Sequence, residues 1–341
     1  MAERLQEMYN FGVKRTELFY SNVLSKMTGA NVYVKREDLQ ENKSFKIRGA
    51  MNNMLAKIEE GKKDNIFVCA STGNHAQGVA ISCYKMHKYG IIFMPKNASQ
   101  IKIEKTKHFG GDLVEIKLVG DNFDECLAIA EQQTKKYGYC FIHPYDDVNT
   151  IEGQATLMEE VKAQLAEKGE KCDLVFSPVG GGGLISGIIN VVEKYNMNTK
   201  VVGCQTELCH PLTISLEKDE NIASEIAKKE VIADGSLVKK LGNLTWNIIN
   251  NAYKKGEFAL EVLKNDKVLY CMGMAKIEHN IDVEGAGGLS FAGFLQYAKT
   301  HDVKGKNVVL VNSGGNVLQE MQEKAVNFYN NRNVNTTLFN V

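Results

Sequence analysis

The sequence is poor in proline and carries no excess of charge of either sign. Only four of its 341 residues are proline, and 41 basic residues are balanced by 41 acidic ones. This balance argues against the basic surface of a nucleic-acid-binding protein and against a polybasic membrane anchor. No Pro/Ser-rich linker, low-complexity tract or repeat divides the chain. A chain of this length suits one large domain or two domains of intermediate size.

Long apolar runs are also missing. No stretch approaches the roughly 18 apolar residues that a transmembrane helix needs. The N-terminus, Met1-Ala2-Glu3-Arg4-Leu5, is polar and charged where a secretory signal would become apolar. Several of the eight scattered cysteines lie in apolar runs, so we predict reduced core thiols and no disulfide framework. The chain is therefore predicted to be cytoplasmic, with neither a membrane nor a nucleic acid as partner.

Apolar, β-branched runs alternate with segments of helical periodicity along most of the chain. The predicted strands are residues 31–35, 66–70, 91–94, 113–118, 140–142, 174–177, 201–205 and 308–311. The predicted amphipathic helices include residues 49–59, 76–87, 123–137, 151–167 and 184–195. Strands that alternate with helices of this length predict right-handed βαβ units and a parallel sheet. The fold class is α/β.

The domain organisation has to be inferred from topology. Residues 51–148 carry several short βα units, whereas most of the motifs with chemical potential lie outside this stretch or at its start. We therefore predict a small domain, residues 51–148, inserted into a larger one made of residues 1–50 and 149–341.

Lys46 lies in the motif Ser44-Phe45-Lys46-Ile47-Arg48-Gly49-Ala50. A lysine can hold an aldehyde cofactor as a Schiff base. An aromatic neighbour and partial burial at the start of an apolar helix favour the neutral amine that this chemistry needs. The alternative is a surface lysine at a helix start, and the heptapeptide alone leaves both interpretations open.

A pure glycine run, Gly180-Gly181-Gly182-Gly183, separates an apolar strand from an apolar helix. Four successive glycines allow neighbouring backbone N–H groups to converge on one phosphate, and the helix dipole favours the anion. The run is neither a Walker loop nor a dinucleotide-binding fingerprint. A flexible turn is the alternative, but we predict a phosphate site.

Two further loops follow predicted strands. Ser71-Thr72-Gly73-Asn74-His75 offers hydroxyls, an amide and N–H groups for a carboxylate, although Ser71 or Asn74 could simply cap a helix. No proton-transfer role is predicted for His75. The other loop is Ser313-Gly314-Gly315-Asn316. Ligands of open α/β sheets gather at the carboxyl ends of strands, so these loops are predicted to converge.

Together these motifs resemble the fold-type II pyridoxal-phosphate enzymes, in the threonine dehydratase and serine racemase branch. The resemblance extends over nearly the whole chain and is carried by residues 34–40, 44–50, 71–77, 143–147, 153–154, 178–187, 233–235, 283–287 and 313–316. It implies a fold like the tryptophan synthase β chain, with two domains that each hold a twisted, mainly parallel sheet flanked by helices. It also implies pyridoxal 5'-phosphate as cofactor.

The resemblance further implies roles for single residues. Lys46 would bind the aldehyde and act as the catalytic base. The other implied cofactor contacts are Phe45 on the ring face, Asn74 at the ring hydroxyl, Gly180, Gly181, Gly182, Gly183 and the Leu184 amide at the phosphate, Ser313 at the pyridine nitrogen, and Gly235 and Glu284 along the ring. The substrate carboxylate would be bound by Ser71, Thr72, Asn74 and His75.

Two departures from the family pattern concern metal and regulation. Serine racemases resembling this chain use a glutamate as a cation ligand where Gln205 stands here. The nearby Cys204, Glu207, Cys209 and His210 match no standard zinc spacing, so we predict no metal. About 25 residues follow Asn316, too few for the regulatory domain of biosynthetic threonine dehydratases. The short, degradative type is the better match.

The implied reaction converts L-threonine into 2-oxobutanoate and ammonia, with L-serine to pyruvate as a second activity. A homodimer or homotetramer is expected. Alternatives are a serine racemase with side lyase activity, another hydroxy-amino-acid ammonia-lyase such as a hydroxyaspartate dehydratase, and a non-enzymatic sensor. Thr72 stands where racemases resembling this chain have serine, and residues 120–123 lack their arginine. Both features favour elimination over racemisation.

Overall fold

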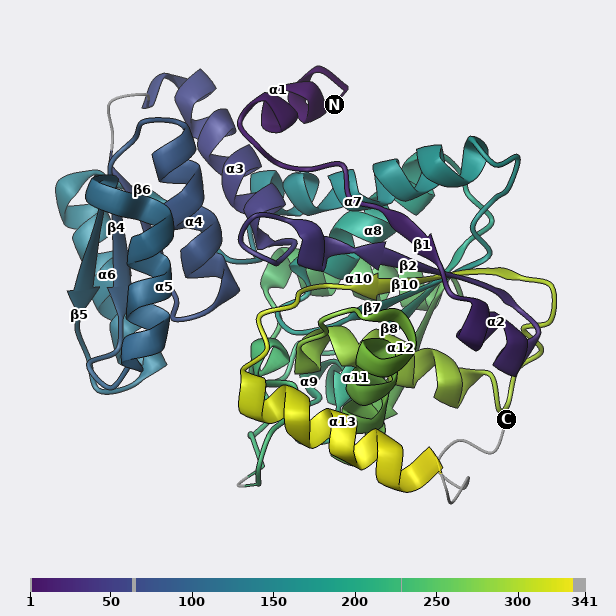
Figure 1. Cartoon of the computed structure of the whole chain (residues 1–341). Coiled ribbons are helices and arrows are strands. Elements are labelled where there is room, and N and C mark those ends of the chain that lie inside the picture. Colours follow the sequence, from purple (N-terminus) through teal and green to yellow (C-terminus); the bar gives the residue numbers. More distant parts are fainter. Residues whose placement is uncertain (1, 63–65, 228, 334–341) are drawn as a thin grey trace. The chain divides into compact units, whose positions relative to one another are not determined.

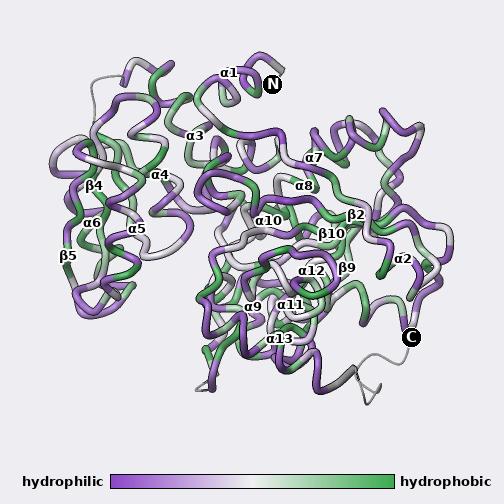
Figure 2. The backbone as a smooth tube through the Cα atoms, viewed as in Figure 1, coloured by the Kyte–Doolittle hydropathy of each residue, from purple (hydrophilic) through white to green (hydrophobic). Residues whose placement is uncertain are grey.

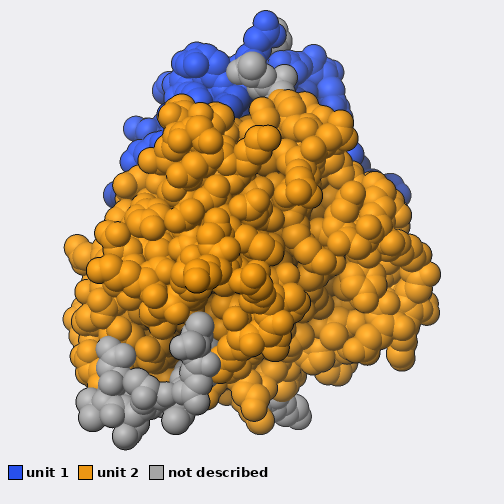
Figure 3. Space-filling view, turned by 90° about the vertical axis from the view of Figure 1, so that its right-hand side faces the viewer, with its two compact units in different colours: residues 1–15, 40–156 blue, residues 16–39, 157–341 orange. Residues whose placement is uncertain are grey.

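The computed structural model describes residues 2–62, 66–227 and 229–333 (Figure 1). The chain separates into two compact units (Figure 3). The first comprises Met1–Arg15 and Gln40–Thr156, and the second comprises Thr16–Leu39 and Leu157–Val341. Both are α/β, so the predicted fold class is confirmed. The predicted inserted segment lies within the first unit, and its boundaries at residues 50 and 149 stay a prediction.

The first unit contains a four-stranded parallel sheet. Its order is β5 (Val114–Leu118), β4 (Gly90–Met94), β3 (Phe67–Ala70) and β6 (Cys140–Phe141). Its helices are α1 (Ala2–Asn10), α3 (Lys46–Lys57), α4 (Asn74–Lys85), α5 (Gln100–Gly110) and α6 (Phe123–Tyr137), and α7 (Val148–Ala166) begins here. Alternate residues of β3 enter two separate cores, Phe67 with α3 and α4 and Val68 with α6. Because successive side chains of a strand point to opposite faces, the two cores lie on opposite faces of the sheet, and helices cover both.

The second unit contains a six-stranded sheet. Its order is β1 (Leu18–Tyr20), β2 (Asn31–Arg36), β10 (Asn307–Asn312), β7 (Leu174–Pro178), β8 (Lys200–Thr206) and β9 (Phe258–Leu263), and only β1 is antiparallel to its neighbour. Its helices are α2 (Asn22–Thr28), α8 (Gly183–Lys194), α9 (Pro211–Lys218), α10 (Asn243–Lys254), α11 (Asn265–His279), α12 (Gly285–Tyr297) and α13 (Gln319–Asn333). Apolar α12 packs on the middle strands, where Gly293 lies against Cys204 of β8.

The predicted strands are confirmed, with no bound shifted by more than one residue. Two further strands, β1 and β9, were not predicted. Each lies at an edge of the larger sheet, where one side of the strand is unpaired and hydrophobic patterning is weak. β1 has only three residues, and β9 carries Glu261 in a largely half-buried segment. By contrast, all five residues of the inner strand β4 are buried, and four of them are hydrophobic (Figure 2).

The interior holds both thiols and charges. All eight cysteines are free and buried, so the prediction of core thiols is confirmed. Burial raises the pKa of the Cys83 thiol to about 12, which keeps it protonated. Two charged residues near the end of the inner strand β2 are also buried: Lys35 within the strand and Glu37 just after it are both 0% exposed. In the part of the chain that the structure describes, no helix is long and apolar enough to cross a membrane.

Candidate active site

Lys46 is the first residue of α3 in the first unit. Its ammonium donates a hydrogen bond to the Pro144 carbonyl at 2.9 Å and lies 5.2 Å from the centroid of the Phe45 ring. Both side chains are half-buried. Gly78 of α4 allows the two helices to approach closely, since a Cβ there would lie 3.1 Å from the Lys46 carbonyl group. The backbone that carries the lysine is therefore fixed by packing.

The loop that presents Pro144 is held by its own hydrogen bonds. The His143 ring nitrogen Nδ1 accepts from the Asp146 amide at 2.7 Å, and the Thr150 hydroxyl donates to the His143 carbonyl at 2.9 Å. His143 and Pro144 belong to a motif that carries the family resemblance, but the motif predicted no role for them. Only the fold shows that a carbonyl 98 positions away holds the lysine.

The Ser71 loop leads from β3 into α4. The N-cap of α4 is Gly73, and no side chain caps the helix, so the alternative that Ser71 or Asn74 caps it is wrong. The Ser71 hydroxyl instead accepts from the Gly73 amide at 3.1 Å. The first amides of a helix have no acceptor within the helix. The start of α4 has no side-chain cap, and Ser71, Thr72 and Asn74 lie half-buried beside it. Backbone amides and polar side chains there are the hydrogen-bond donors that a carboxylate needs.

His75 is 3% exposed, and its Nε2 lies 2.8 Å from the Ile142 carbonyl. Burial, and next the positive charge of Lys46, lower the His75 pKa to about 3. The ring is therefore neutral near pH 7, and Nε2–H is the donor to the carbonyl. Its side chain is engaged away from solvent, so a carboxylate contact would have to use the backbone amide of His75. The predicted contact stays a prediction.

The glycine run lies in the second unit, between the carboxyl end of β7 and the start of α8. Its N-cap, Gly182, has φ +94°, and a Cβ there would lie 2.7 Å from the Cβ of Thr245. A larger residue is thus excluded by both conformation and space. The Thr245 hydroxyl donates to the Gly181 carbonyl at 2.7 Å and holds the loop. No side chain caps α8, which leaves its first amides and its positive dipole end for an anion.

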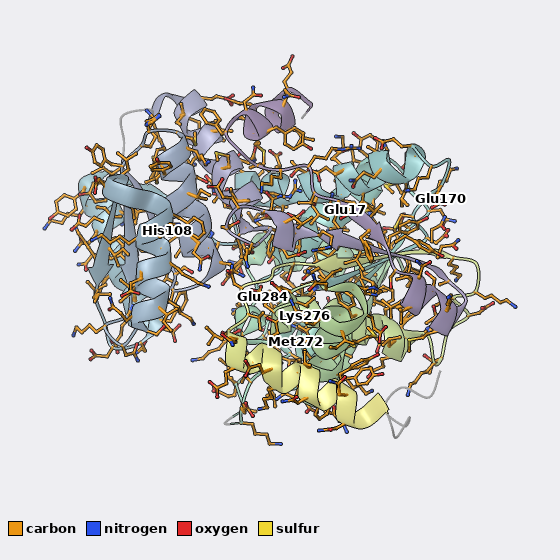
Figure 4. The ribbon with its side chains drawn as sticks, viewed as in Figure 1. Glu17, His108, Glu170, Met272, Lys276 and Glu284 are labelled. Atoms are coloured by element: carbon orange, nitrogen blue, oxygen red, sulfur yellow. The ribbon has the colours of Figure 1, made fainter. Side chains whose placement is uncertain are left out.

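Ser313 follows β10 in the same unit and is 1% exposed. The next residue, Gly314, accepts a hydrogen bond from the Glu284 amide at 3.0 Å, and a Cβ on Gly314 would lie 2.7 Å from the Glu284 carboxylate. Glu284 is the N-cap of α12 and is 9% exposed; Figure 4 labels it. A Cβ on Gly235 would lie 3.8 Å from the same carboxylate. Gly235, Glu284 and the Ser313 loop are therefore neighbours.

The glycine run and the Glu284–Ser313 neighbourhood are linked through one short helix, η4 (Asp234–Ser236). Gly180 packs on Ser236 of η4, with a would-be Cβ 3.2 Å from the Ser236 carbonyl oxygen. Thus the second unit brings together the predicted residues Gly180 to Leu184, Gly235, Glu284 and Ser313. The first unit brings together the predicted residues Phe45, Lys46, Ser71, Thr72, Asn74 and His75. Thr245, which orders the glycine run, carried no signal in the sequence.

The metal prediction concerned the end of β8. Gln205 is 1% exposed and donates from Nε2 to the Val179 carbonyl at 3.4 Å. Cys204 and Cys209 are buried, and the Cys209 thiol donates to the Val238 carbonyl at 3.5 Å. Across the described ranges, the structure holds no group of three or more His, Cys, Asp or Glu placed to bind a metal ion.

Comparison with known proteins identifies the family. Residues 9–314 match the family described as pyridoxal-phosphate dependent enzymes. The chain belongs to this family. Among pyridoxal-phosphate dependent enzymes, an L-threonine ammonia-lyase of Thermotoga maritima is 38% identical over 315 residues, covering 92% of this chain and 74% of that protein. A biosynthetic L-threonine dehydratase of Staphylococcus epidermidis is 35% identical over 322 residues, covering 93% and 74%.

The fold of this pyridoxal-phosphate dependent enzyme also matches solved structures. The processed form of threonine deaminase isoform 2 from Solanum lycopersicum gives a TM-score of 0.84 at 30% identity and covers 96% of this chain and 93% of that one. The donors described above fit the cofactor of the family. An amine at Lys46 suits an aldehyde, an uncapped helix start in a glycine cradle suits a phosphate, and a buried neutral hydroxyl at Ser313 suits a ring nitrogen.

Proposed function

We propose that this protein deaminates L-threonine to 2-oxobutanoate and ammonia, and L-serine to pyruvate and ammonia as a second activity. The observation that carries the proposal is the intact set of Lys46, the glycine run and Ser313 in a chain 38% identical to an L-threonine ammonia-lyase. The reaction first loses one water across Cα and Cβ, and hydrolysis of the resulting imine then consumes one water. The net change is the release of ammonia.

The proposed division of labour follows the chemistry of each group. Lys46 would hold the cofactor aldehyde; the amides of Gly183 and Leu184 would hold its phosphate. Phe45, Asn74, Gly235 and Glu284 would surround its ring. When bound, pyridoxal phosphate supplies an electron-withdrawing system that acidifies the Cα–H bond of an attached amino acid.

The chain itself would bind the substrate and move the proton. The uncapped start of α4, with Ser71, Thr72 and Asn74, would bind and orient the substrate carboxylate. The Lys46 amine would take the Cα proton as general base. A neutral Ser313 hydroxyl at the ring nitrogen would place no charge beside that nitrogen, which favours rapid elimination.

A keto-acid assay over a panel of hydroxy amino acids tests this proposal. We expect 2-oxobutanoate from L-threonine and pyruvate from L-serine, with threonine turned over faster, and no D-serine in the remaining substrate. Turnover of hydroxyaspartate alone would indicate a different lyase of the branch. No keto acid from any substrate, with no cofactor taken up, would contradict the proposed function.

Thr72 separates a lyase from a racemase. Its β-branched side chain restricts χ1, so its hydroxyl is poorly suited to act as a second base. Thr72→Ala is therefore expected to leave threonine deamination within about threefold of the wild-type rate, because general-base chemistry would reside on Lys46. Steady-state kinetics and chiral analysis of unreacted serine measure the effect.

Thr72→Ser is the matched control, since it keeps the hydroxyl and removes the methyl group. A lyase should gain little D-serine formation from this change. If the wild-type protein forms D-serine as fast as pyruvate and Thr72→Ala abolishes it, racemase becomes the better assignment.

The same proposal extends to how the chain assembles and where in the cell it acts. We expect a homodimer or homotetramer located in the cytoplasm. Sedimentation and fractionation measure the two properties independently of activity.

A further inference from the structure

The loop that carries Ser313 is held through the residue before it. Asn312 ends β10, and its side chain is 0% exposed. Its amide nitrogen Nδ2 donates to Asp38 Oδ1 at 2.8 Å and to the Asp282 carbonyl at 3.2 Å. Asp38 belongs to the short helix η1 (Glu37–Leu39), which follows the neighbouring strand β2. The orientation of Asn312 is therefore set by a carboxylate from another strand end.

Asp38 is itself held firmly. The Arg36 guanidinium donates from Nε to Asp38 Oδ1 at 2.9 Å and from Nη2 to Oδ2 at 2.7 Å. This two-point arrangement fixes the carboxylate in direction as well as distance. Asp38 is 9% exposed and also packs on Gly315, where a Cβ would lie 2.9 Å from the Asp38 Cβ. Asp38 thus touches the loop on both sides of Ser313.

The opposite side of the loop is held by the segment before α12. The Asp282 carbonyl packs on Gly315 as well as accepting from Asn312, and the Glu284 amide donates to Gly314. The Asp282 carboxylate accepts from Lys276 and Gln322, both at 2.8 Å (Figure 4 labels Lys276). Asp38 and Asp282, each held by its own ion pair, therefore contact Asn312 and Gly315, the residues that flank Ser313 and Gly314.

We propose that Asp38, fixed by Arg36 and fixing Asn312, is a positioning residue for Ser313. The inference rests on the proposed function, in which the Ser313 hydroxyl meets the cofactor's ring nitrogen. A hydrogen bond weakens steeply when its angle is poor, so a neutral hydroxyl is an effective partner only if its backbone is held in place. Asp38 contacts the loop and acts on the ring through Ser313.

A second carboxylate that bonds β10 separates positioning from simple stabilisation. Asp173, just before β7, accepts a hydrogen bond from the backbone amide of Asn307, the first residue of β10, at 2.7 Å. It anchors the strand end away from Ser313, whereas Asp38 anchors the end next to it. Asp173→Asn is therefore the matched control for Asp38→Asn, because both remove one charge that holds β10.

The experiment compares these two variants with Ser313→Ala and the wild-type protein, each loaded with pyridoxal phosphate. The readouts are the absorption spectrum of the bound cofactor, its dissociation constant, kcat and KM for threonine, and the urea midpoint followed by Trp246 fluorescence. Trp246 is the single tryptophan and lies in the same unit. For Asp38→Asn we expect an altered spectrum like that of Ser313→Ala, and a kcat lower by about tenfold with KM within about twofold.

Asp173→Asn is expected to lower the urea midpoint while leaving the spectrum and kcat unchanged. If Asp38→Asn does the same, the positioning role is overturned. If Asp38→Asn does not fold, Arg36→Gln replaces it. Arg36 is partly exposed, so its replacement should be tolerated while it removes the ion pair that fixes the Asp38 carboxylate. The spectrum should then shift in the same direction as expected for Asp38→Asn. A spectrum unchanged in Arg36→Gln would then overturn the role.

The proposed function and the positioning role of Asp38 are tested by different outcomes. An active wild-type protein with a spectrum sensitive to Ser313→Ala but not to Asp38→Asn contradicts only the positioning role. A wild-type protein that binds no cofactor contradicts the proposed function itself.

Discussion

Lys46→Ala is expected to lower 2-oxobutanoate formation from threonine by at least about 10⁴-fold, because one substitution removes both the covalent anchor and the general base. The residue begins α3, where its amine is held by the Pro144 carbonyl and lies beside the Phe45 ring. An alanine there fits the helix well, so folding should be unaffected. Keto-acid formation measures the loss, and far-ultraviolet circular dichroism measures the fold.

Lys57→Ala is the matched control for Lys46→Ala. Lys57 ends the same helix and makes a 3.6 Å ion pair with Glu60, partly exposed to solvent. Its replacement should leave activity within about twofold, since such pairs contribute little. Borohydride treatment of the loaded wild-type protein, followed by peptide mapping, should place the cofactor on Lys46. A label on another lysine, or an active Lys46→Ala protein, would show that the assignment is wrong.

Glu160→Gln is expected to destabilise the second unit by about 3–5 kcal/mol, because it removes the charge of the carboxylate that lies 2.6 Å from a buried ammonium. Lys35 and Glu160 have side chains that are 0% and 1% exposed, and their charged atoms are 2.6 Å apart. Lys35 also donates to the Thr16 carbonyl at 2.8 Å and to Gln164 at 2.9 Å. These neutral acceptors replace water but supply no charge. Urea unfolding followed by Trp246 fluorescence measures the change.

The neighbouring residue on α7 is the control for Glu160. Glu159→Gln breaks a 3.0 Å ion pair with Lys194, whose side chain is 40% exposed, and should cost no more than about 1 kcal/mol. The double variant Lys35→Met with Glu160→Leu should recover much of the stability lost in Glu160→Gln, because both charges of this pair are then replaced by apolar groups. Equal free energies of unfolding for Glu159→Gln and Glu160→Gln would contradict a buried, charge-dependent pair.

Lys46 and the glycine run could be recognised from the amino-acid sequence because their signals are contiguous. A helix start offers amides from consecutive residues, so one short segment of sequence contains a whole anion site. The Ser71 loop was recognised for the same reason. Its capping alternative failed because Ser71 bonds the Gly73 amide and leaves α4 uncapped, a choice between local hydrogen bonds that residue types do not decide.

The residues that order the site could not be recognised in this way. Thr245 bonds the glycine run across 64 positions, and Asn312 bonds Asp38 across 274. Neither pair shares a periodic pattern or a motif spacing. They meet because β2 lies beside β10 and because α10 packs on α8, which are facts of strand order and helix packing.

The α/β class, the inner strands, the family and the lysine and glycine motifs could all be predicted from residue order, because each depends on periodicity or on residues adjacent in the chain. Only the folded chain shows that Lys35 of β2 is buried and paired to Glu160, and that Asp38 lies against the Ser313 loop. Burying a charge is favourable only when a partner from elsewhere in the chain meets it at short range. For Asp38 the partner is set by the strand order, which places β2 beside β10, whereas for Lys35 the partner comes from helix α7.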